Sequence, residues 1–157
     1  MGLIRIVWGT ATAPTEKASY DGALAEANIH NYNLVQLSSV IPRSGTLEVV
    51  GAAPDLGPTG TQLTVVQARE TVTTGDAVAG LSWATEGNGR GIFYEASGTD
   101  PDAVTTKLAD GIAAGRELRD WDFSDTGQKI VGAPAQPGDT YTTTVVCAVY
   151  GNARPIL

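Results

Sequence analysis

Apolar and polar residues alternate along much of the chain, which predicts a protein built largely of β-strands. Residues 32–41 are apolar on both faces of an extended chain, so we expect one continuous strand there, covered on both sides and ended by Pro42. Gly87-Asn88-Gly89 has the composition of a tight hairpin turn. The predicted strands are residues 4–9, 32–41, 62–68, 77–85, 91–96 and 140–150.

Two helices are expected between these strands. A helix start at Thr99-Asp100-Pro101-Asp102 is followed by apolar residues every fourth position, which predicts an amphipathic helix to about residue 118. A shorter helix over 20–28 would be capped by Ser19, with Asp21 in its first turn. Loops are expected at 10–17 and 45–60. This order of elements predicts an α/β layered sandwich in a single domain, 1–157.

The amino-acid composition limits the classes of function that this protein can have. Hydrophobic residues make up 42% of the 157 residues and charged residues 17%, which is typical of a globular domain. Ten Lys and Arg against 17 Asp and Glu give a formal charge of −7, so a nucleic-acid or membrane partner is not expected. A single cysteine, Cys147, excludes an internal disulfide. We expect a cytoplasmic protein.

The sequence lacks the signatures of several common kinds of functional site. His30 is the only histidine, so no metal site is expected, and this residue is predicted to be exposed near a helix end. Gly87-x-Gly89-x-Gly91 leads into a strand rather than a helix, which argues against a nucleotide-binding loop. Cys147 lies in a strand rich in Thr and Val and is expected to be a buried apolar residue.

Ser38 and Ser39 form an unusual polar pair near the end of an apolar run. Composition alone is compatible with a strand end at which the hydroxyls bond backbone groups. The pair belongs to a longer series of segments that resembles the pyruvoyl-dependent arginine decarboxylases. The segments are Tyr20-Asp21-Gly22-Ala23-Leu24, Asn31-x-Asn33-Leu34, Leu37-Ser38-Ser39-Val40-Ile41-Pro42 and Gly91-Ile92-Phe93-Tyr94-Glu95.

The resemblance implies a sandwich of mostly antiparallel sheet with flanking helices, and a chain that cuts itself. By this resemblance Ser39 attacks the carbonyl of Ser38 and becomes a covalent pyruvoyl cofactor. The chain is then divided into residues 1–38, the β chain, and 39–157, the α chain. Because a serine hydroxyl is a weak nucleophile, the step needs a donor for the developing oxyanion, and Asn33 is the matching candidate.

Asn33 and Ser39 raise a geometrical problem. Six residues of extended strand separate them by roughly 20 Å. Either the strand breaks, or Asn33 serves Ser39 of a neighbouring subunit. The trimeric assembly of the family, with sites between protomers, fits the second arrangement.

The implied reaction assigns roles to further residues. The pyruvoyl carbonyl forms a Schiff base with the amine of the substrate and accepts electrons as CO₂ leaves. Glu95 is the candidate proton donor, because the apolar residues before it are expected to raise its pKa, although a solvated strand residue is the alternative. Asp21 matches a substrate guanidinium but also suits a helix start. Leu24, Ser38 and Val40 are expected to contact the substrate.

The resemblance therefore implies decarboxylation of arginine to agmatine and CO₂ by a homotrimer of processed protomers. Two alternatives remain open at this stage. One is a pyruvoyl-dependent decarboxylase of another amino acid. The other is an unprocessed trimeric paralogue without catalytic activity.

Overall fold

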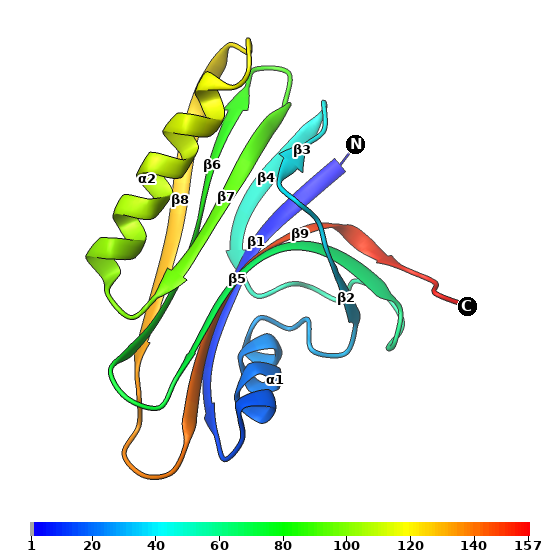
Figure 1. The fold of residues 1–157 in the computed structure, drawn as a ribbon. Coiled ribbons are helices and arrows are strands. Elements are labelled where there is room, and N and C mark those ends of the chain that lie inside the picture. The colour runs from blue at the N-terminus through cyan, green and yellow to red at the C-terminus, as the bar shows by residue number, and fades with distance from the viewer. Residues whose placement is uncertain (1) are drawn as a thin grey trace.

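The chain folds into two β-sheets that lie face to face, and one helix covers the outer side of each sheet (Figure 1). The computed structural model describes residues 2–157. In chain order the elements are β1 (Gly2–Ala13), α1 (Glu16–Glu26), β2 (Asn33–Gln36), β3 (Val40–Ile41), β4 (Gly45–Gly51), β5 (Gln62–Val72), β6 (Asp76–Glu86), β7 (Gly91–Gly98), α2 (Pro101–Glu117), β8 (Phe123–Pro134) and β9 (Tyr141–Arg154). The predicted α/β layered sandwich is confirmed.

The two sheets are mostly antiparallel, as expected. The larger sheet has the order β2-β5-β9-β1-β4, with parallel pairing only between β2 and β5 and between β1 and β4. The smaller sheet has the order β3-β7-β6-β8 and is antiparallel throughout. In Figure 1, α1 lies against the larger sheet and α2 runs along the outside of the smaller one.

The predicted strand over residues 32–41 is wrong, and this is the largest difference from the sequence analysis. The chain leaves the larger sheet after Gln36 and joins the smaller sheet at Val40, so two short strands replace one. It is not covered on both sides either, because Val35, Leu37 and Val40 are 41%, 37% and 49% exposed. The apolar residues on both faces of this segment therefore belong to an exposed connection between the two sheets, which we call the crossing, and not to a buried strand.

Helix α1 begins one turn earlier than predicted. Thr15 is the N-cap, and its hydroxyl oxygen accepts a hydrogen bond from the backbone N–H of Ala18 at 3.1 Å. Ser19 is a buried helical residue whose hydroxyl donates to the carbonyl of Glu16 at 2.7 Å. The predicted loop over 10–17 was also wrong, because β1 continues to Ala13 and pairs with β9 along that length.

Glycines allow α1 to lie very close to β1. A Cβ atom at Gly9 would sit 2.0 Å from the carbonyl oxygen of Ala23, and one at Gly22 would sit 2.7 Å from the Cβ of Ala11. Gly22, which weakens the helix by propensity, is therefore required by packing. This close contact fixes the position of Asp21 relative to the larger sheet.

The second predicted helix is confirmed as α2. Asp100 caps it by accepting a hydrogen bond from the N–H of Asp102 at 3.0 Å, and Pro101 occupies the first turn. Val104 and Leu108 are buried against the smaller sheet, as their spacing indicated. Local signals therefore located this helix correctly.

Apart from the segment 32–41, each predicted strand is found in the structure, but two further strands were missed. β6 and β7 are confirmed, and Gly89, with φ of 91°, lies in the turn that joins them. β4 and β8 were not predicted, because residues 45–60 are rich in turn formers and residues 123–134 carry few apolar side chains. Both form edge strands, whose solvent-facing positions weaken the hydrophobic pattern.

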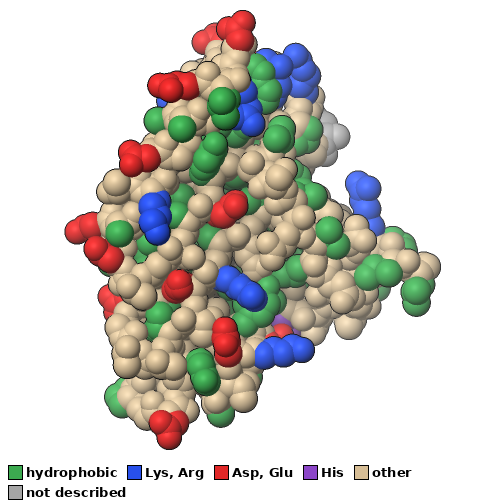
Figure 2. All heavy atoms as spheres, viewed as in Figure 1, with side chains coloured by type: hydrophobic (Ala, Val, Ile, Leu, Met, Phe, Trp, Pro, Cys, Tyr) green, Lys and Arg blue, Asp and Glu red, His purple; other side chains and the backbone are tan. Residues whose placement is uncertain are grey.

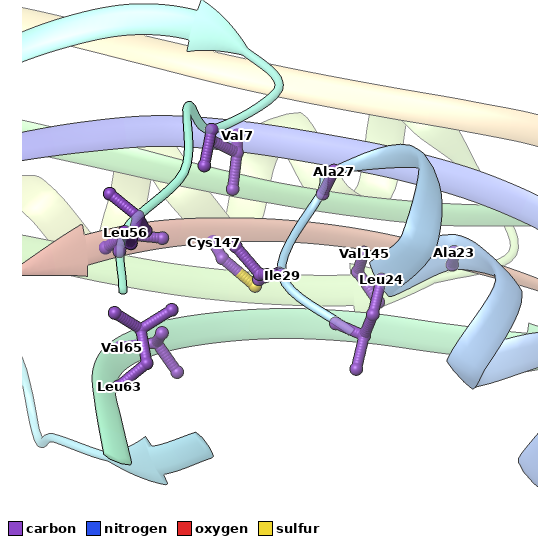
Figure 3. Packing of buried hydrophobic residues seen from close by; sticks show 12 residues of the cluster. Val7, Ala23, Leu24, Ala27, Ile29, Leu56, Leu63, Val65, Val145 and Cys147 are labelled. Carbon is purple, nitrogen blue, oxygen red and sulfur yellow. The ribbon is translucent and has the colours of Figure 1, made fainter. Parts of the chain in front are cut away.

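Cys147 belongs to the apolar core between α1 and the larger sheet. Figure 3 shows its sulfur among Ile29, Val145 and neighbouring apolar side chains. The side chain is fully buried, and this burial raises the pKa of the thiol to about 12. The prediction that Cys147 packs as a buried apolar residue is confirmed.

The molecular surface carries no single dominant acidic patch on the face seen in Figure 2, where acidic side chains are scattered among basic ones. Any attraction of a cationic ligand on this face therefore depends on individual carboxylates rather than on a broad field. Within residues 2–157, neither helix is long and apolar enough to cross a membrane.

Candidate active site

Ser38 and Ser39 lie in the crossing between the two sheets. The N–H of Leu37 still donates to the carbonyl of Val65 on β5 at 2.8 Å, and pairing with β7 is established by Val40. Ser38 is exposed and Ser39 is half-buried, and neither belongs to a strand. The peptide bond between them is thus accessible, while the chain on each side is held by a sheet.

The chain after this peptide bond is anchored by contacts from two directions. The backbone N–H of Phe93 donates to the carbonyl of Ser39 at 2.8 Å. The hydroxyl of Tyr150, on β9 of the opposite sheet, donates to the carbonyl of Val40 at 3.0 Å. Ile41 is completely buried between the sheets. Residues 39–41 are therefore held firmly although β3 contains only two residues.

Glu95 lies on the strand that binds Ser39. It is two residues beyond Phe93 along β7, which corresponds to roughly 7 Å, and strand alternation places both side chains on the same face. The structure thus brings Glu95 and the serine pair into the same region. Although the side chain is exposed as a whole, partial burial of the carboxyl group raises its pKa above the ordinary range of a glutamate.

A cavity of about 570 Å³ opens beside Glu95, and we call it the Glu95 cavity. It lies beyond the end of β2, which pairs with β5 only as far as Val65. Two cations, Arg69 and Lys107, share this cavity with Glu95. Its walls are Gln36, Gln67, Ala68, Arg69, Glu95, Ala96, Ser97 and Lys107.

A second cavity, of about 670 Å³, lies between α1 and β2, and we call it the helix cavity. It is lined by Asp21, Leu24 and Asn33, among others, and His30 stands exposed at its wall, as predicted for that residue. Asp21 is the sixth residue of α1, so the expected helix-start role for its carboxylate is wrong. Within residues 2–157, that carboxylate makes no hydrogen bond or ion pair.

Asn33 and Ser39 do not meet within one chain. The strand breaks between them, which was one of the two arrangements considered, but the break leads Ser39 away to the other sheet. Asn33 lines the helix cavity, and its side-chain N–H donates to the carbonyl of Gly60 at 2.8 Å. Leu24 lies one turn after Asp21 on the same face of α1, as expected.

Tyr20 lies between the two cavities, and its sequence context predicted no role for its side chain. It lines the helix cavity, while its hydroxyl donates to the side-chain oxygen of Gln67, which lines the Glu95 cavity, at 2.9 Å. The Arg69 guanidinium lies 4.3 Å from the centre of the Tyr20 ring. No role was predicted for the Tyr150 side chain either. Neither contact has a local sequence signal, because the partners are 47 and 110 residues apart.

Comparison with known proteins gives a consistent result. The sequence model of the family described as pyruvoyl-dependent arginine decarboxylase (PvlArgDC) matches residues 3–155. The chain is 48% identical to a pyruvoyl-dependent arginine decarboxylase of Halobacterium salinarum, over 99% of this chain and 98% of that protein. It is 31% identical to the protein of the same name from Pyrococcus furiosus, over 88% of each chain.

A further relative, from Thermococcus sibiricus and also named pyruvoyl-dependent arginine decarboxylase, is 32% identical over 74% of this chain and 75% of its own. The match to the family model over residues 3–155 includes the serine crossing, both cavities and the strand that carries Glu95. The resemblance noted in the sequence is confirmed, and the chain belongs to the pyruvoyl-dependent arginine decarboxylase family.

Proposed function

We propose that this chain cuts itself between Ser38 and Ser39 and then decarboxylates arginine to agmatine and CO₂. The products of the cut are residues 1–38 and 39–157. The observation that carries the proposal is the accessible peptide bond between Ser38 and Ser39, followed by a firmly bound residue 39 beside Glu95. We expect the enzyme to act in the cytoplasm on a small-molecule amino acid.

The serine crossing suits formation of a pyruvoyl group. Because the bond lies outside both sheets, its carbonyl can be approached by the Ser39 hydroxyl without breaking strand pairs. Attack replaces the peptide bond by an ester, and β-elimination then releases the Ser38 carboxylate. Water takes the place of the residue 39 nitrogen, which leaves as ammonia. The carbonyl of residue 39 is present both in the serine and in the pyruvoyl group. The hydrogen bond that it accepts from the N–H of Phe93 can therefore persist through these steps.

Glu95 supplies the proton in the proposed reaction. The pyruvoyl carbonyl provides the electron sink for the electrons left when CO₂ departs. The carbon that loses CO₂ then needs a proton, and Glu95 lies on the strand that holds residue 39. Its raised pKa keeps more of the carboxyl group protonated near neutral pH than in an ordinary glutamate, which a proton donor requires.

Asp21 and Leu24 would select the substrate in this proposal. An unpaired, exposed carboxylate can accept two parallel hydrogen bonds from a guanidinium, and Leu24 beside it can contact the aliphatic part of arginine. Ser38, as the new carboxyl end, and the exposed Val40 would complete the contacts near residue 39. An acidic substrate would be repelled by Asp21.

We further propose that the complete site forms between protomers of a homotrimer. Within one chain, Asp21 and Asn33 share the helix cavity, whereas Ser39 and Glu95 lie on the crossing and on β7. Asn33 can then act as oxyanion donor for Ser39 of a neighbouring subunit. The exposed apolar residues Val35, Leu37 and Val40, which flank the serine pair, support a protein partner at this position.

Mixed assemblies test whether Asn33 acts across subunits. Asn33→Ala should slow self-cleavage by about 10²–10³-fold, the usual effect of losing an oxyanion donor. Coexpression with Ser39→Ala, which retains Asn33, should restore cleavage of the Asn33→Ala chains, as measured by intact mass. Coexpression with the Asn33→Ala/Ser39→Ala double variant is the matched control and should restore nothing. Equal cleavage in both mixtures would contradict the arrangement.

Asp21→Asn should raise the KM for arginine by about 10- to 100-fold, because it removes charge-assisted hydrogen bonds to the guanidinium. Self-cleavage should be complete, and kcat should change much less than KM. Steady-state kinetics with arginine and with its uncharged analogue citrulline measure the effect on selectivity. Glu16→Gln, which changes an exposed acid of the same helix outside the cavity lining, is the control. An unchanged KM in Asp21→Asn would exclude the guanidinium contact.

The proposed function as a whole is tested by mass spectrometry of the purified protein under denaturing conditions, followed by an assay for CO₂ and agmatine. Two fragments divided between Ser38 and Ser39, the larger without a free amino terminus, together with turnover of arginine, are expected. A chain that stays whole on incubation would reject the enzyme assignment. Fragments that turn over a different amino acid would reject arginine as the substrate.

A further inference from the structure

The cut proposed above would turn residue 39 into a chain end, which must then stay beside Glu95. Chain ends fray unless other contacts hold them. Strand β3 contains only Val40 and Ile41 and is the edge strand of the smaller sheet, with β7 as its one neighbour. Two residues of edge pairing are a weak anchor for a group that must be positioned for repeated reaction.

Tyr150 supplies a second anchor from the opposite sheet. It lies on β9, and its hydroxyl donates to the Val40 carbonyl at 3.0 Å. Its ring is tilted by 60° against that of Phe93, with the ring centres 6.2 Å apart. The backbone N–H of Phe93 in turn donates to the Ser39 carbonyl at 2.8 Å. Tyr150 and Phe93, which contact each other, thus hold the carbonyls of the consecutive residues Val40 and Ser39.

The Tyr150 side chain packs against the core between the sheets on one side and is open on another. A cavity of about 290 Å³ lies beside the side chain, between Gly2, Pro42 and Arg154, so the ring is not enclosed on all sides. Partial burial raises the pKa of the Tyr150 hydroxyl above its usual range. The hydroxyl therefore remains a hydrogen-bond donor over the whole neutral and moderately alkaline range.

We propose that Tyr150 is a positioning residue whose hydroxyl, together with the N–H of Phe93, clamps residues 39 and 40 beside Glu95 after the chain is cut. This proposal rests on the proposed self-cleavage, because an uncut chain is also held from residue 38. The clamp connects β9 of the larger sheet to β3 of the smaller sheet. It lies next to the peptide bond whose cleavage ends the backbone connection between the two sheets through residues 38 and 39. Tyr150 acts only through the chain end and needs no contact with the substrate.

Tyr150→Phe tests the clamp, because it removes one oxygen and retains the ring. Tyr141→Phe is the matched control, since Tyr141 lies at the other end of β9 and its hydroxyl has no hydrogen bond within residues 2–157. Intact mass establishes that each variant is cut. Hydrogen exchange of the Phe93 amide, which donates to the Ser39 carbonyl, and of the Ile41 amide, together with the rate at which hydroxylamine traps the ketone of the cut chain, reports on the chain end without turnover.

In Tyr150→Phe we expect complete cleavage, exchange of these amides faster by about tenfold, and a similar fall in kcat, which is the usual effect of losing one hydrogen bond. The KM for arginine should change less than twofold, and the trapping rate should differ from that of the parent. Tyr141→Phe should match the parent in every measurement.

Three results would overturn the clamp. The first is a cleaved Tyr150→Phe protein with the exchange, trapping rate and kcat of the parent. The second is a folded variant that fails to cleave, because the hydroxyl would then act before the cut. The third is a parent protein that is never cut, which would remove the proposed function as well and is recognised by mass before any variant is made.

Discussion

Ser39→Ala should remain a single chain of 157 residues on prolonged incubation and should show no decarboxylation of arginine. The alanine side chain has no hydroxyl to attack the Ser38 carbonyl, so neither the ester nor the pyruvoyl group can form. Loss of the cofactor should lower the rate by at least about 10⁶-fold, the lower end of enzymatic rate enhancements. Intact mass and a sensitive assay for released CO₂ measure the two effects.

Ser38→Ala is the informative control for this change. It alters the neighbouring hydroxyl but leaves the Ser39 nucleophile and the carbonyl that it attacks, so the chain should still be cut at the same bond. The smaller fragment should then be lighter by one oxygen atom. Cleavage of Ser39→Ala at this bond, or an uncut but folded Ser38→Ala chain, would assign the nucleophile to another residue.

Glu95→Gln should separate cleavage from turnover. The amide keeps the size of the side chain but cannot deliver a proton, so we expect complete self-cleavage and a decarboxylation rate lower by about 10²–10⁴-fold. Glu48→Gln, an exposed acid on the edge strand β4, makes the same chemical change outside both cavities and should leave the rate unaltered. A Glu95→Gln enzyme with the parent rate would exclude Glu95 as the proton donor.

The pH dependence gives a second test of Glu95. Because burial raises the pKa of this carboxyl group, its protonated form survives to higher pH than in an ordinary glutamate. The decarboxylation rate should therefore be retained at low pH and fall as the pH rises through that pKa. The residual rate of Glu95→Gln should show no fall in the same interval. A common pH profile for both proteins would assign the titration to another group.

The same pKa has a consequence for stability. Folding disfavours the ionised form of Glu95, so the stability that this group contributes is complete below the pKa of the unfolded chain. It is lost as the pH rises through the raised pKa of the folded chain. Over that interval the melting temperature of Glu95→Gln should depend less on pH than that of the parent.

Local sequence signals predicted the parts of the fold that depend on neighbouring residues. The cap at Asp100 with Pro101 and the spacing of Val104 and Leu108 are short-range features, and α2 forms where they indicated. The Gly89 turn between β6 and β7 is another. At the other helix the sequence predicted Ser19 as the cap, but Thr15 caps it, because β1 extends to Ala13 and the helix begins earlier.

Sequence patterns failed where the hydrophobic signal had two explanations. Val35, Leu37 and Val40 indicated a buried strand, but they lie exposed on the crossing between sheets. Strand pairing, rather than composition, decides where a chain leaves one sheet for another, and β5 and β7 are the partners that define this crossing. Edge strands β4 and β8 were missed because solvent-facing positions carry little periodic signal.

The candidate site divides in the same way. The sequence by itself determined the family, and it singled out the serine pair and the carboxylates Asp21 and Glu95 as candidates for the chemistry, because these follow from residue types in a fixed order. Only the tertiary structure decided that Asn33 and Ser39 separate, that Asp21 lies beyond the helix start, and that Tyr150 reaches Val40 across 110 residues. Such contacts depend on how two sheets pack, and packing joins residues that no local pattern relates.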